Sequence, residues 1–398
     1  MNKQVLIAGG GIGGLAAALG ASRAGWDVRL YERAGAFSEV GAGVQLGPNV
    51  VRRLQAWGLQ RALQSVAAFP ERLQVRSALS GRELAVLPLG ADAVQRYGAA
   101  YATVHRADLH GVLLAAVETC ESVQLNLGLG IERHAEANGA ILVRTTRGKD
   151  VEGDALIGAD GLWSHTRVQL LGDGPPRSTG HLAYRAIVPQ RALPKALRTR
   201  QVTAWLGPRL HAVQYPVRRG ELQNIVVIVQ GPARQDLQSW DHAANAADLK
   251  GALAGSCSAL QTLVRSVPAW RLWPLSDRPP VRSAAQMAQG LVALLGDAAH
   301  PMRPYLAQGA GMAIEDAAQL QHALAMHDLE VPLRLRRYAL NRWERNARVQ
   351  ARSQRNGRIF HATGPVRWGR DAALRLLGPR LLDLPWLYRG DGSSASSL

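Results

Sequence analysis

The sequence predicts an α/β fold, in which an inserted and mainly antiparallel sheet interrupts a parallel sheet covered by helices, and a helical segment follows at the C-terminus. Two observations lead to this prediction. Continuous apolar runs at 5–8 and 291–295 suit buried parallel strands, and glycines and a helix-forming segment follow each run. Residues 184–229 instead hold four strand-like runs with short turns, a pattern typical of an antiparallel sheet.

The N-terminal run leads into the glycine pattern G-x-G-x-x-G. Gly9 allows a tight turn, and Gly11 leaves room for a pyrophosphate. Gly14 lets the predicted helix of residues 15–24 pack closely on the preceding strand. The N-terminus of that helix offers free N–H groups and the positive end of its dipole to phosphates.

A second strand at 28–31 ends at Glu32, whose carboxylate can accept hydrogen bonds from a ribose diol. A lone glycine pattern is a weak signal, but here strand, turn, helix, strand and acid occur in the required order. The alternative is a glycine-rich turn in an ordinary α/β domain. The motif by itself leaves NAD and FAD open.

Two further glycine-acid pairs follow later strands. Asp160 follows the run at 155–157 after two small residues, and Asp297 comes directly after Gly296. An acid at the carboxyl end of a parallel strand lies at the crevice where ligands bind. Asp297 can accept from the hydroxyls of a ribityl chain, and the helix that starts after Gly309 can direct N–H groups at the electron-accepting end of a flavin. A nicotinamide has no such requirement, so these features favour FAD.

The predicted domains are discontinuous. A Rossmann-like FAD-binding domain comprises residues 1–72, 101–182 and 274–345, a substrate-binding sheet domain comprises 73–100 and 183–273, and C-terminal helices with a frayed tail comprise 346–398. Within the inserted domain, residues 250–267 are expected to form a helix.

Composition narrows the choice of partners and compartment. The 398-residue chain has a net charge of +17, but its basic residues are scattered, which disfavours nucleic acid and suits anionic cofactors and a carboxylate substrate. Cys120 and Cys257 have no metal-ligand spacing, so no metal is expected and a reducing cytoplasm fits. No apolar run reaches the length of a spanning helix, and no leader precedes the first strand, so no membrane is expected.

With its three motifs in order, the chain resembles the single-component FAD-dependent aromatic hydroxylases related to salicylate and p-hydroxybenzoate hydroxylase. The resemblance covers roughly residues 5–316. The stretches GAGVQLGPN, HAVQYPVRRGELQN and YLAQGAGMAIEDA are most similar to 3-hydroxybenzoate 6-hydroxylases and 6-hydroxynicotinate 3-monooxygenases. The resemblance implies hydroxylation of a small phenolic or hydroxypyridine carboxylate with O2 and NADH or NADPH, through a flavin C4a-hydroperoxide. It leaves monomer and homodimer open.

The resemblance also implies contacts to each part of FAD. These are Gly9, Gly11 and Gly14 for the pyrophosphate, Glu32 and Arg33 for the adenosine ribose, Leu129 or a neighbour as far as Ile131 for the adenine, Arg106 for the phosphates, Gln45 near the ribityl chain, and Asp297 with Gly309, Ala310, Gly311 and Met312 for the ribityl chain and isoalloxazine ring. Asp160 would serve both FAD and the nicotinamide donor, which binds transiently and needs no second dinucleotide motif.

The stretch LHAVQYP supplies the candidate catalytic groups. Side chains alternate along a strand, so His211 and Tyr215 share one face, about 13 Å apart. A general base helps because the substrate reacts best as its anion, and histidine suits that role near neutral pH. His211 is therefore the predicted base, and Tyr215 would bind the ring or its carboxylate. The alternative is that His211 faces solvent or makes a hydrogen bond that a loop requires.

Other positions concern the substrate pocket. Tyr305 is expected to line it, and Arg185 to pair with a carboxylate, support the flavin or form an ion pair at a domain interface. His300 is interpreted as a buried structural histidine. Related 6-hydroxynicotinate enzymes carry a histidine at the position of Gly47, which this chain lacks.

Two other functions compete with the hydroxylase. One is a flavin-dependent oxidase or reductase on the same scaffold, which would yield peroxide without oxygen insertion. The other is a non-enzymatic basic protein with a structural flavin, which would show no substrate-stimulated NAD(P)H oxidation and would bind nucleic acid in a salt-sensitive way.

Overall fold

The structure is a computed structural model that describes residues 2–37, 42–231, 242–243 and 246–390. The chain divides into two compact units. Unit 1 comprises Met1–Val40, Ala107–Arg177 and Asp277–Gln354, and unit 2 comprises Gly41–Arg106, Ser178–Ser276 and Arg355–Leu398. Residues 42–72 and 101–106 pack within unit 2, whereas the sequence groups them with the cofactor domain. The functional assignment of the domains stays a prediction.

Unit 1 is built on a six-stranded sheet with the order β18-β19-β11-β1-β2-β7. Its strands are β1 (Gln4–Ala8), β2 (Asp27–Glu32), β7 (Val123–Leu127), β11 (Ala155–Gly158), β18 (Ala288–Gln289) and β19 (Val292–Leu294). β19, β11, β1, β2 and β7 run parallel, and β18 is antiparallel to β19. The predicted Rossmann-like fold is confirmed.

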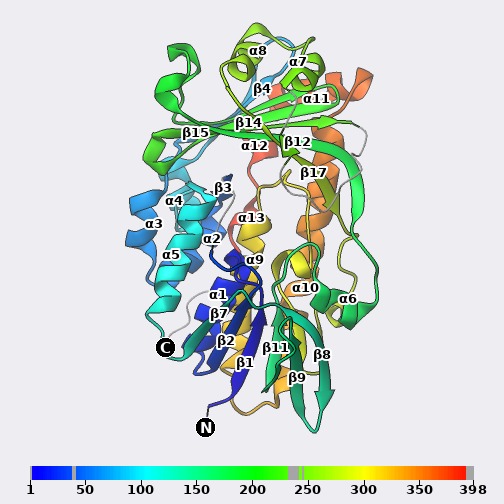
Figure 1. The fold of residues 1–398 in the computed structure, drawn as a ribbon. Coiled ribbons are helices and arrows are strands. Elements are labelled where there is room, and N and C mark those ends of the chain that lie inside the picture. Colours follow the sequence, from blue (N-terminus) through cyan, green and yellow to red (C-terminus); the bar gives the residue numbers. More distant parts are fainter. Residues whose placement is uncertain (1, 38–41, 232–241, 244–245, 391–398) are drawn as a thin grey trace. The chain divides into compact units, whose positions relative to one another are not determined.

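Helices pack beside this sheet (Figure 1). The unit contains α1 (Ile12–Arg23), α6 (His165–Leu171), α9 (Gly309–Leu324), most of α5 (Arg106–Glu118) and most of α10 (Val331–Phe360), together with the antiparallel strands β8 (Ile131–Ala137), β9 (Ala140–Thr145) and β10 (Asp150–Gly153). α1 and α9 approach closely, since a Cβ on Gly20 would lie 3.0 Å from the carbonyl oxygen of Ala317. The small residues of α1 therefore allow helix contact on one side while the sheet covers the other.

Unit 2 is built on an eight-stranded sheet with the order β16-β17-β12-β15-β14-β13-β4-β5. Its strands are β4 (Arg72–Ser77), β5 (Glu83–Pro88), β12 (Arg177–Pro189), β13 (Val202–Gly207), β14 (Leu210–Val217), β15 (Leu222–Gln230), β16 (His242–Ala243) and β17 (Arg271–Asp277). β13 and β4 are parallel, whereas β12, β15, β14 and β13 pair antiparallel. The predicted, mainly antiparallel sheet is confirmed.

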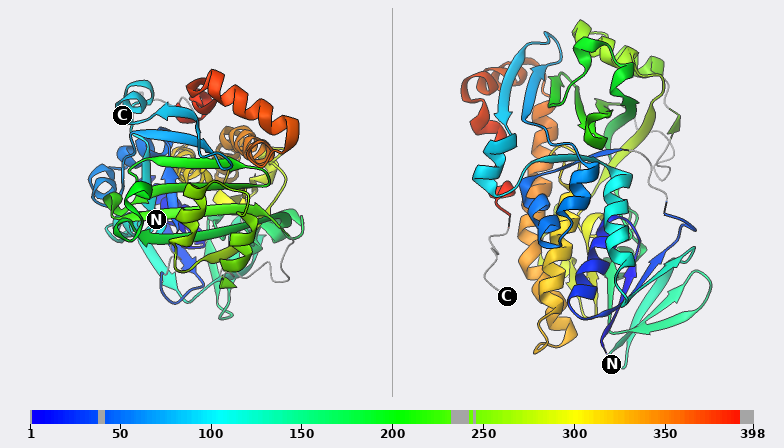
Figure 2. Two further views of the ribbon diagram at one scale, coloured as in Figure 1. Left: turned by 90° about the horizontal axis from the view of Figure 1, so that it is seen from above. Right: turned by 90° about the vertical axis from the view of Figure 1, so that its left-hand side faces the viewer.

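One face of this sheet is covered by α7 (Ala246–Ala252) and α8 (Ser258–Arg265), as Figures 1 and 2 show. Trp205, Ile225 and Leu260 belong to the core between strands and helices. The prediction of one helix over 250–267 is wrong. The chain turns at 253–257, where the Cys257 N–H donates to the carbonyl of Ala78, 2.7 Å away, and α8 then begins in a new direction.

The remaining elements of unit 2 are β3 (Gly43–Leu46) paired with β6 (Ala102–His105), and the helices α2 (Pro48–Ala56), α3 (Gln60–Val66), α4 (Gly90–Tyr97), α11 (Gly364–Leu377), α12 (Pro379–Leu382) and α13 (Pro385–Tyr388). α10 continues to Phe360, and residues 391–398 of the predicted tail lie outside the described residues. Among the described helices, none has both the length and the apolar character that crossing a membrane requires.

Candidate cofactor and substrate sites

The three sequence motifs converge at the carboxyl edge of the unit 1 sheet. β1 ends before Gly9, β11 ends before Asp160, and β19 ends before Asp297. A Cβ on Gly9 would lie 2.5 Å from the carbonyl oxygen of Ala159, so the first motif contacts the second. A Cβ on Gly13 would lie 3.0 Å from Cδ2 of Leu295, so the first motif also contacts the third.

The glycines of the first motif have different surroundings. A Cβ on Gly14 would lie 1.8 Å from the carbonyl oxygen of Gly9, whereas a Cβ on Gly11 would meet nothing within 4 Å. Gly11 is also the N-cap of α1, where no side chain caps the helix and no acid occupies the first turn. Open space beside an uncapped helix N-terminus fits an anionic pyrophosphate.

The Glu32 carboxylate, which is predicted to bind the adenosine ribose, also hydrogen-bonds to the glycine loop. Its Oε2 accepts from the N–H of Gly10 at 2.7 Å, and its Oε1 accepts from the N–H of Ala34 at 2.8 Å. The N–H of Leu129 donates to the Glu32 carbonyl at 2.9 Å, and Arg33 is exposed. The carboxylate therefore anchors the glycine loop, and the contacts of Glu32, Arg33 and Leu129 with adenosine stay predictions.

His110 on α5 is a loop contact that sequence reasoning missed. Its Nε2 lies 2.8 Å from the carbonyl oxygen of Gly10, and its ring packs against Phe37 with centroids 5.1 Å apart. A histidine inside an apolar helix carries no sequence signal for such a contact, because the partner lies 100 residues away.

Asp160 organises the start of α6. Its carboxylate accepts from Ser164 Oγ at 2.5 Å and from Thr166 Oγ1 at 3.0 Å. On the same helix, the Arg167 guanidinium donates to the carbonyl of Ala298 at 3.0 Å. The second motif is thereby tied to the loop that carries Asp297, and a role of Asp160 toward FAD or the nicotinamide stays a prediction.

The third motif presents an acid and a helix start. Asp297 is exposed in a short 3-10 turn, Gly296–Ala298. Gly309, Ala310, Gly311 and Met312 form the first turn of α9, whose N-cap residue makes no side-chain capping bond to the helix, and a Cβ on Gly309 would meet nothing within 4 Å. Tyr305 in the preceding loop is 4% exposed, and burial raises its pKa, so its phenol is neutral. These residues fit a flavin.

A buried polar network supports the Asp297 loop. His300 is fully buried, as predicted, and its Nε2 lies 2.5 Å from Asp316 Oδ2. The same oxygen accepts from the Gly296 N–H at 3.1 Å, and Arg342 Nε lies 2.7 Å from Oδ1. Burial raises the pKa of Asp316, but the nearby His300 and Arg342 together lower it by more than burial raises it. The pKa of Asp316 is therefore well below its usual range.

In unit 2, Gln45 and Tyr215 lie together. Tyr101 Oη donates to Gln45 Oε1 at 2.8 Å, and Tyr215 also hydrogen-bonds to Gln45. Gly43 makes room for this group, because a Cβ there would lie 2.5 Å from the Tyr215 ring. The Gly43 N–H donates to Asn224 Oδ1 at 2.7 Å. Burial raises the pKa of Tyr215, so its phenol is neutral.

Arg185 lies on the sheet face that also carries Tyr215. Its guanidinium stacks 4.8 Å from the centre of the Trp273 ring. Its buried Nε has no hydrogen-bond partner among the described residues. Burial lowers the pKa of Arg185 to about 10, Tyr215 opposes that shift, and the charge of Arg106 adds to it. The surroundings of Arg185 are therefore positively charged, and its buried Nε–H is a donor that requires a hydrogen-bond acceptor.

His211 is 2% exposed, so it does not face solvent. Its Nδ1 lies 2.7 Å from Nε2 of His361, and its ring packs edge-on against Phe360 at 5.4 Å. Burial, together with His361 and His181, lowers the pKa of His211 well below its usual value. The side chain is neutral at physiological pH and can accept a proton. No local sequence pattern indicates that His361 contacts His211, because the two residues are 150 positions apart.

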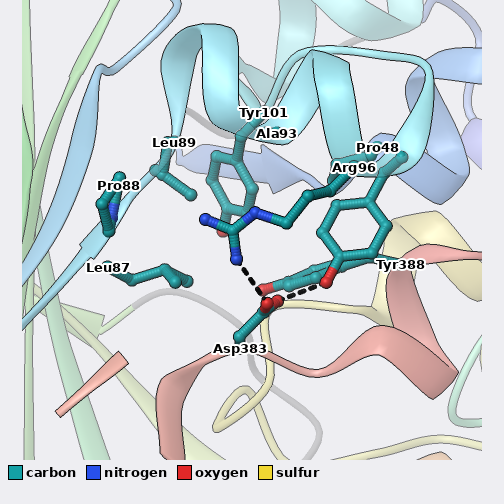
Figure 3. Close-up of a pocket in the computed structure, with 10 residues that line it drawn as sticks. Pro48, Leu87, Pro88, Leu89, Ala93, Arg96, Tyr101, Asp383 and Tyr388 are labelled. Carbon is teal, nitrogen blue, oxygen red and sulfur yellow. Dashed lines mark hydrogen bonds and ion pairs between the residues drawn. The ribbon is translucent and has the colours of Figure 1, made fainter. Parts of the chain in front are cut away.

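The space beside Gly47 belongs to the C-terminal segment. A Cβ on Gly47 would lie 3.1 Å from the ring of Tyr388 on α13. Tyr388 and Tyr101 line a small hollow of about 10 Å³, where Asp383 accepts from Arg96 at 2.7 Å (Figure 3). Any side chain at position 47 would therefore crowd this ring.

The comparisons with known proteins agree with this geometry. A family model described as an FAD binding domain matches residues 2–359. The 3-hydroxybenzoate 6-hydroxylase of Polaromonas naphthalenivorans is 37% identical over 386 residues, which cover 96% of this chain and 95% of that protein. The chain belongs to this family of FAD-dependent aromatic hydroxylases.

Other members of the FAD-dependent hydroxylases are also similar. The 6-hydroxynicotinate 3-monooxygenase of Bordetella bronchiseptica is 37% identical over 358 residues, which cover 89% of this chain and 91% of that protein. A salicylate hydroxylase solved with its substrate superposes with a TM-score of 0.82 at 28% identity, covering 100% of this chain and 99% of that one. The predicted family, fold and FAD cofactor are confirmed. Within the described residues, no group of three or more His, Cys, Asp or Glu side chains could hold a metal ion.

Proposed function

We propose that this FAD-dependent hydroxylase inserts one atom of O2 into a small phenolic or hydroxypyridine carboxylate, with NADH or NADPH as transient electron donor. The overall change is Ar–H + O2 + NAD(P)H + H⁺ to Ar–OH + NAD(P)⁺ + H2O. Bound FAD, once reduced, supplies the electrophilic oxygen. The names of the relatives, which act on hydroxybenzoate and hydroxynicotinate, support this substrate class.

The unpartnered Nε of Arg185 carries the proposal. A buried guanidinium donor requires an acceptor, and a carboxylate meets it with charge-assisted hydrogen bonds. The charge of Arg106 adds attraction for an anion. The Trp273 ring stacks on one face of the Arg185 guanidinium and thereby orients it. The edge of the guanidinium is then available to the ligand.

The strand register aligns Arg185 with an apolar surface that fits an aromatic ring. Arg185 pairs with Val226, and Val226 pairs with Val213 on β14, so these three side chains form one row on the same face. His211 and Tyr215 lie two residues to either side of Val213 on that face. We propose that the ring lies over the two valines, that Arg185 binds its carboxylate, and that His211 takes the phenolic proton. Tyr305 remains a proposed lining residue.

The residues proposed to hold FAD are Gly9, Gly11, Gly14, Glu32, Arg33, Gln45, Arg106, Leu129, Asp160, Asp297, Gly309, Ala310, Gly311 and Met312. The uncapped starts of α1 and α9 support the pyrophosphate and flavin-ring assignments, since both direct N–H groups at negative charge.

The test is a substrate panel on the purified protein. Hydroxybenzoates and hydroxynicotinates are scored for stimulation of NADH and NADPH oxidation, and ¹⁸O from ¹⁸O2 is then traced into the product. We expect at least one member to stimulate oxidation and acquire label. Stoichiometric peroxide without label would instead identify an oxidase or reductase, and no stimulation by any member would contradict the enzymatic proposal.

We further propose a cytoplasmic location and a monomer or homodimer. Both cysteines are free, which suits a reducing compartment. Cell fractionation and size-exclusion chromatography with light scattering test the two statements.

A further inference from the structure

Three buried histidines gather at one end of the unit 2 sheet face. His181 on β12 and His211 on β14 are 8% and 2% exposed, and His361, directly after α10, is 3% exposed. The rings of His181 and His361 lie 4.8 Å apart, and His211 Nδ1 lies 2.7 Å from His361 Nε2. A hydrogen bond between two ring nitrogens requires a proton on one nitrogen and a lone pair on the other.

We propose that His361 is the positioning residue for His211 and receives its proton during turnover. In the resting pair, His211 donates its Nδ1–H to Nε2 of His361, which leaves a lone pair on His211 Nε2. The phenolic proton of the substrate binds to that Nε2. The Nδ1 proton then moves to His361 Nε2, so His211 returns to neutral and His361 carries the positive charge.

The surroundings explain why His211 needs such a partner. Burial disfavours an imidazolium on His211 alone, and the titratable groups that act on it are His361 and His181. Transfer within the pair moves the charge away from the site of proton abstraction. The position of His361 is fixed independently of its ring, because its carbonyl accepts from the Arg209 N–H at 3.0 Å, in the turn that precedes β14. Phe360 packs on His211 from the same segment.

The inference rests on the proposed function, but its first test needs no turnover. Nitrogen-15 NMR of histidine-labelled full-length protein reports which ring nitrogen of His211 carries the proton. We expect the Nδ1–H form in the native protein and a loss of that preference in His361→Phe. An Nε2–H form of His211 in the native protein overturns the proposal.

The second test is kinetic, with two variants at one position and a neighbouring control. We expect His361→Phe to lower kcat by about 10²-fold, the range for lost proton-transfer assistance, with FAD content unchanged. His361→Gln keeps an acceptor near Nε2 and should restore about tenfold of that loss. His181→Phe keeps a ring against His361 and should stay within about threefold of the native rate.

A His361→Phe enzyme within about threefold of the native kcat, or no rescue by glutamine, overturns the relay. Failure of the proposed function looks different. In that case the native protein incorporates no oxygen into any aromatic acid, while the NMR test of the histidine pair still gives its own answer.

Discussion

Gly11 and Gly14 allow the cofactor loop to be tested with two matched glycine-to-alanine changes. In Gly14→Ala the new Cβ would lie 1.8 Å from the Gly9 carbonyl oxygen, so the backbone must move. In Gly11→Ala the Cβ would meet nothing within 4 Å, and the φ of −71° suits any residue. Gly14→Ala should therefore damage the fold, whereas Gly11→Ala should damage only phosphate binding.

The magnitudes follow from these distances. Overpacking against backbone costs about 3 kcal/mol, and at roughly 2–4 °C per kcal/mol Gly14→Ala should lower the Tm of the apoprotein by about 6–12 °C. Gly11→Ala should change that Tm by about 2 °C or less, because only N-cap preference is lost. It should raise the Kd for FAD by about 10- to 100-fold, since a methyl group occupies the pyrophosphate approach and roughly 1.4 kcal/mol corresponds to tenfold.

Differential scanning fluorimetry of the apoproteins and quenching of flavin fluorescence measure the two effects. The native apoprotein is the common reference for both. The phosphate-binding role of Gly11 is refuted if Gly11→Ala destabilises the apoprotein as much as Gly14→Ala does, or if the Gly11→Ala protein binds FAD within about twofold of the native Kd.

Four further changes test other parts of the sites. Asp297→Ala should release FAD, and a fully yellow purified variant would contradict this. His211→Ala should slow hydroxylation by about 10²–10⁴-fold while FAD stays bound, and unchanged turnover would refute the base assignment. Arg185→Met should raise KM for the aromatic acid by about 10- to 100-fold with a smaller effect on kcat, as steady-state kinetics can show. The folded-state pKa of Asp316 is depressed, so its contribution to stability is present above about pH 4 and is lost as pH falls through the folded-state pKa. Asp316→Asn should therefore destabilise by about 3–5 kcal/mol at pH 7 and flatten acid unfolding, as denaturation curves at several pH values would reveal.

The fold class and the FAD motifs could be predicted from the sequence because each depends on residues that are close together in the chain. A strand, a glycine turn and a helix occur consecutively, and each residue has its role within one supersecondary unit. The break between α7 and α8 at 253–257 could not be predicted from the sequence, because the Cys257 N–H donates there to the carbonyl of Ala78, which is distant in the chain. The second task of Glu32, which holds two loop N–H groups, likewise depends on how the loop folds back.

By itself, the sequence determined the α/β class, the three cofactor motifs and the shared face of His211 and Tyr215, since strand alternation and motif spacing are properties of neighbouring residues. Only the tertiary structure decided what those side chains contact. His211 meets His361 from a position 150 residues away, Arg185 stacks on Trp273, and Tyr388 fills the space beside Gly47. Such contacts depend on sheet register and on where the C-terminal helices return, which no local pattern encodes.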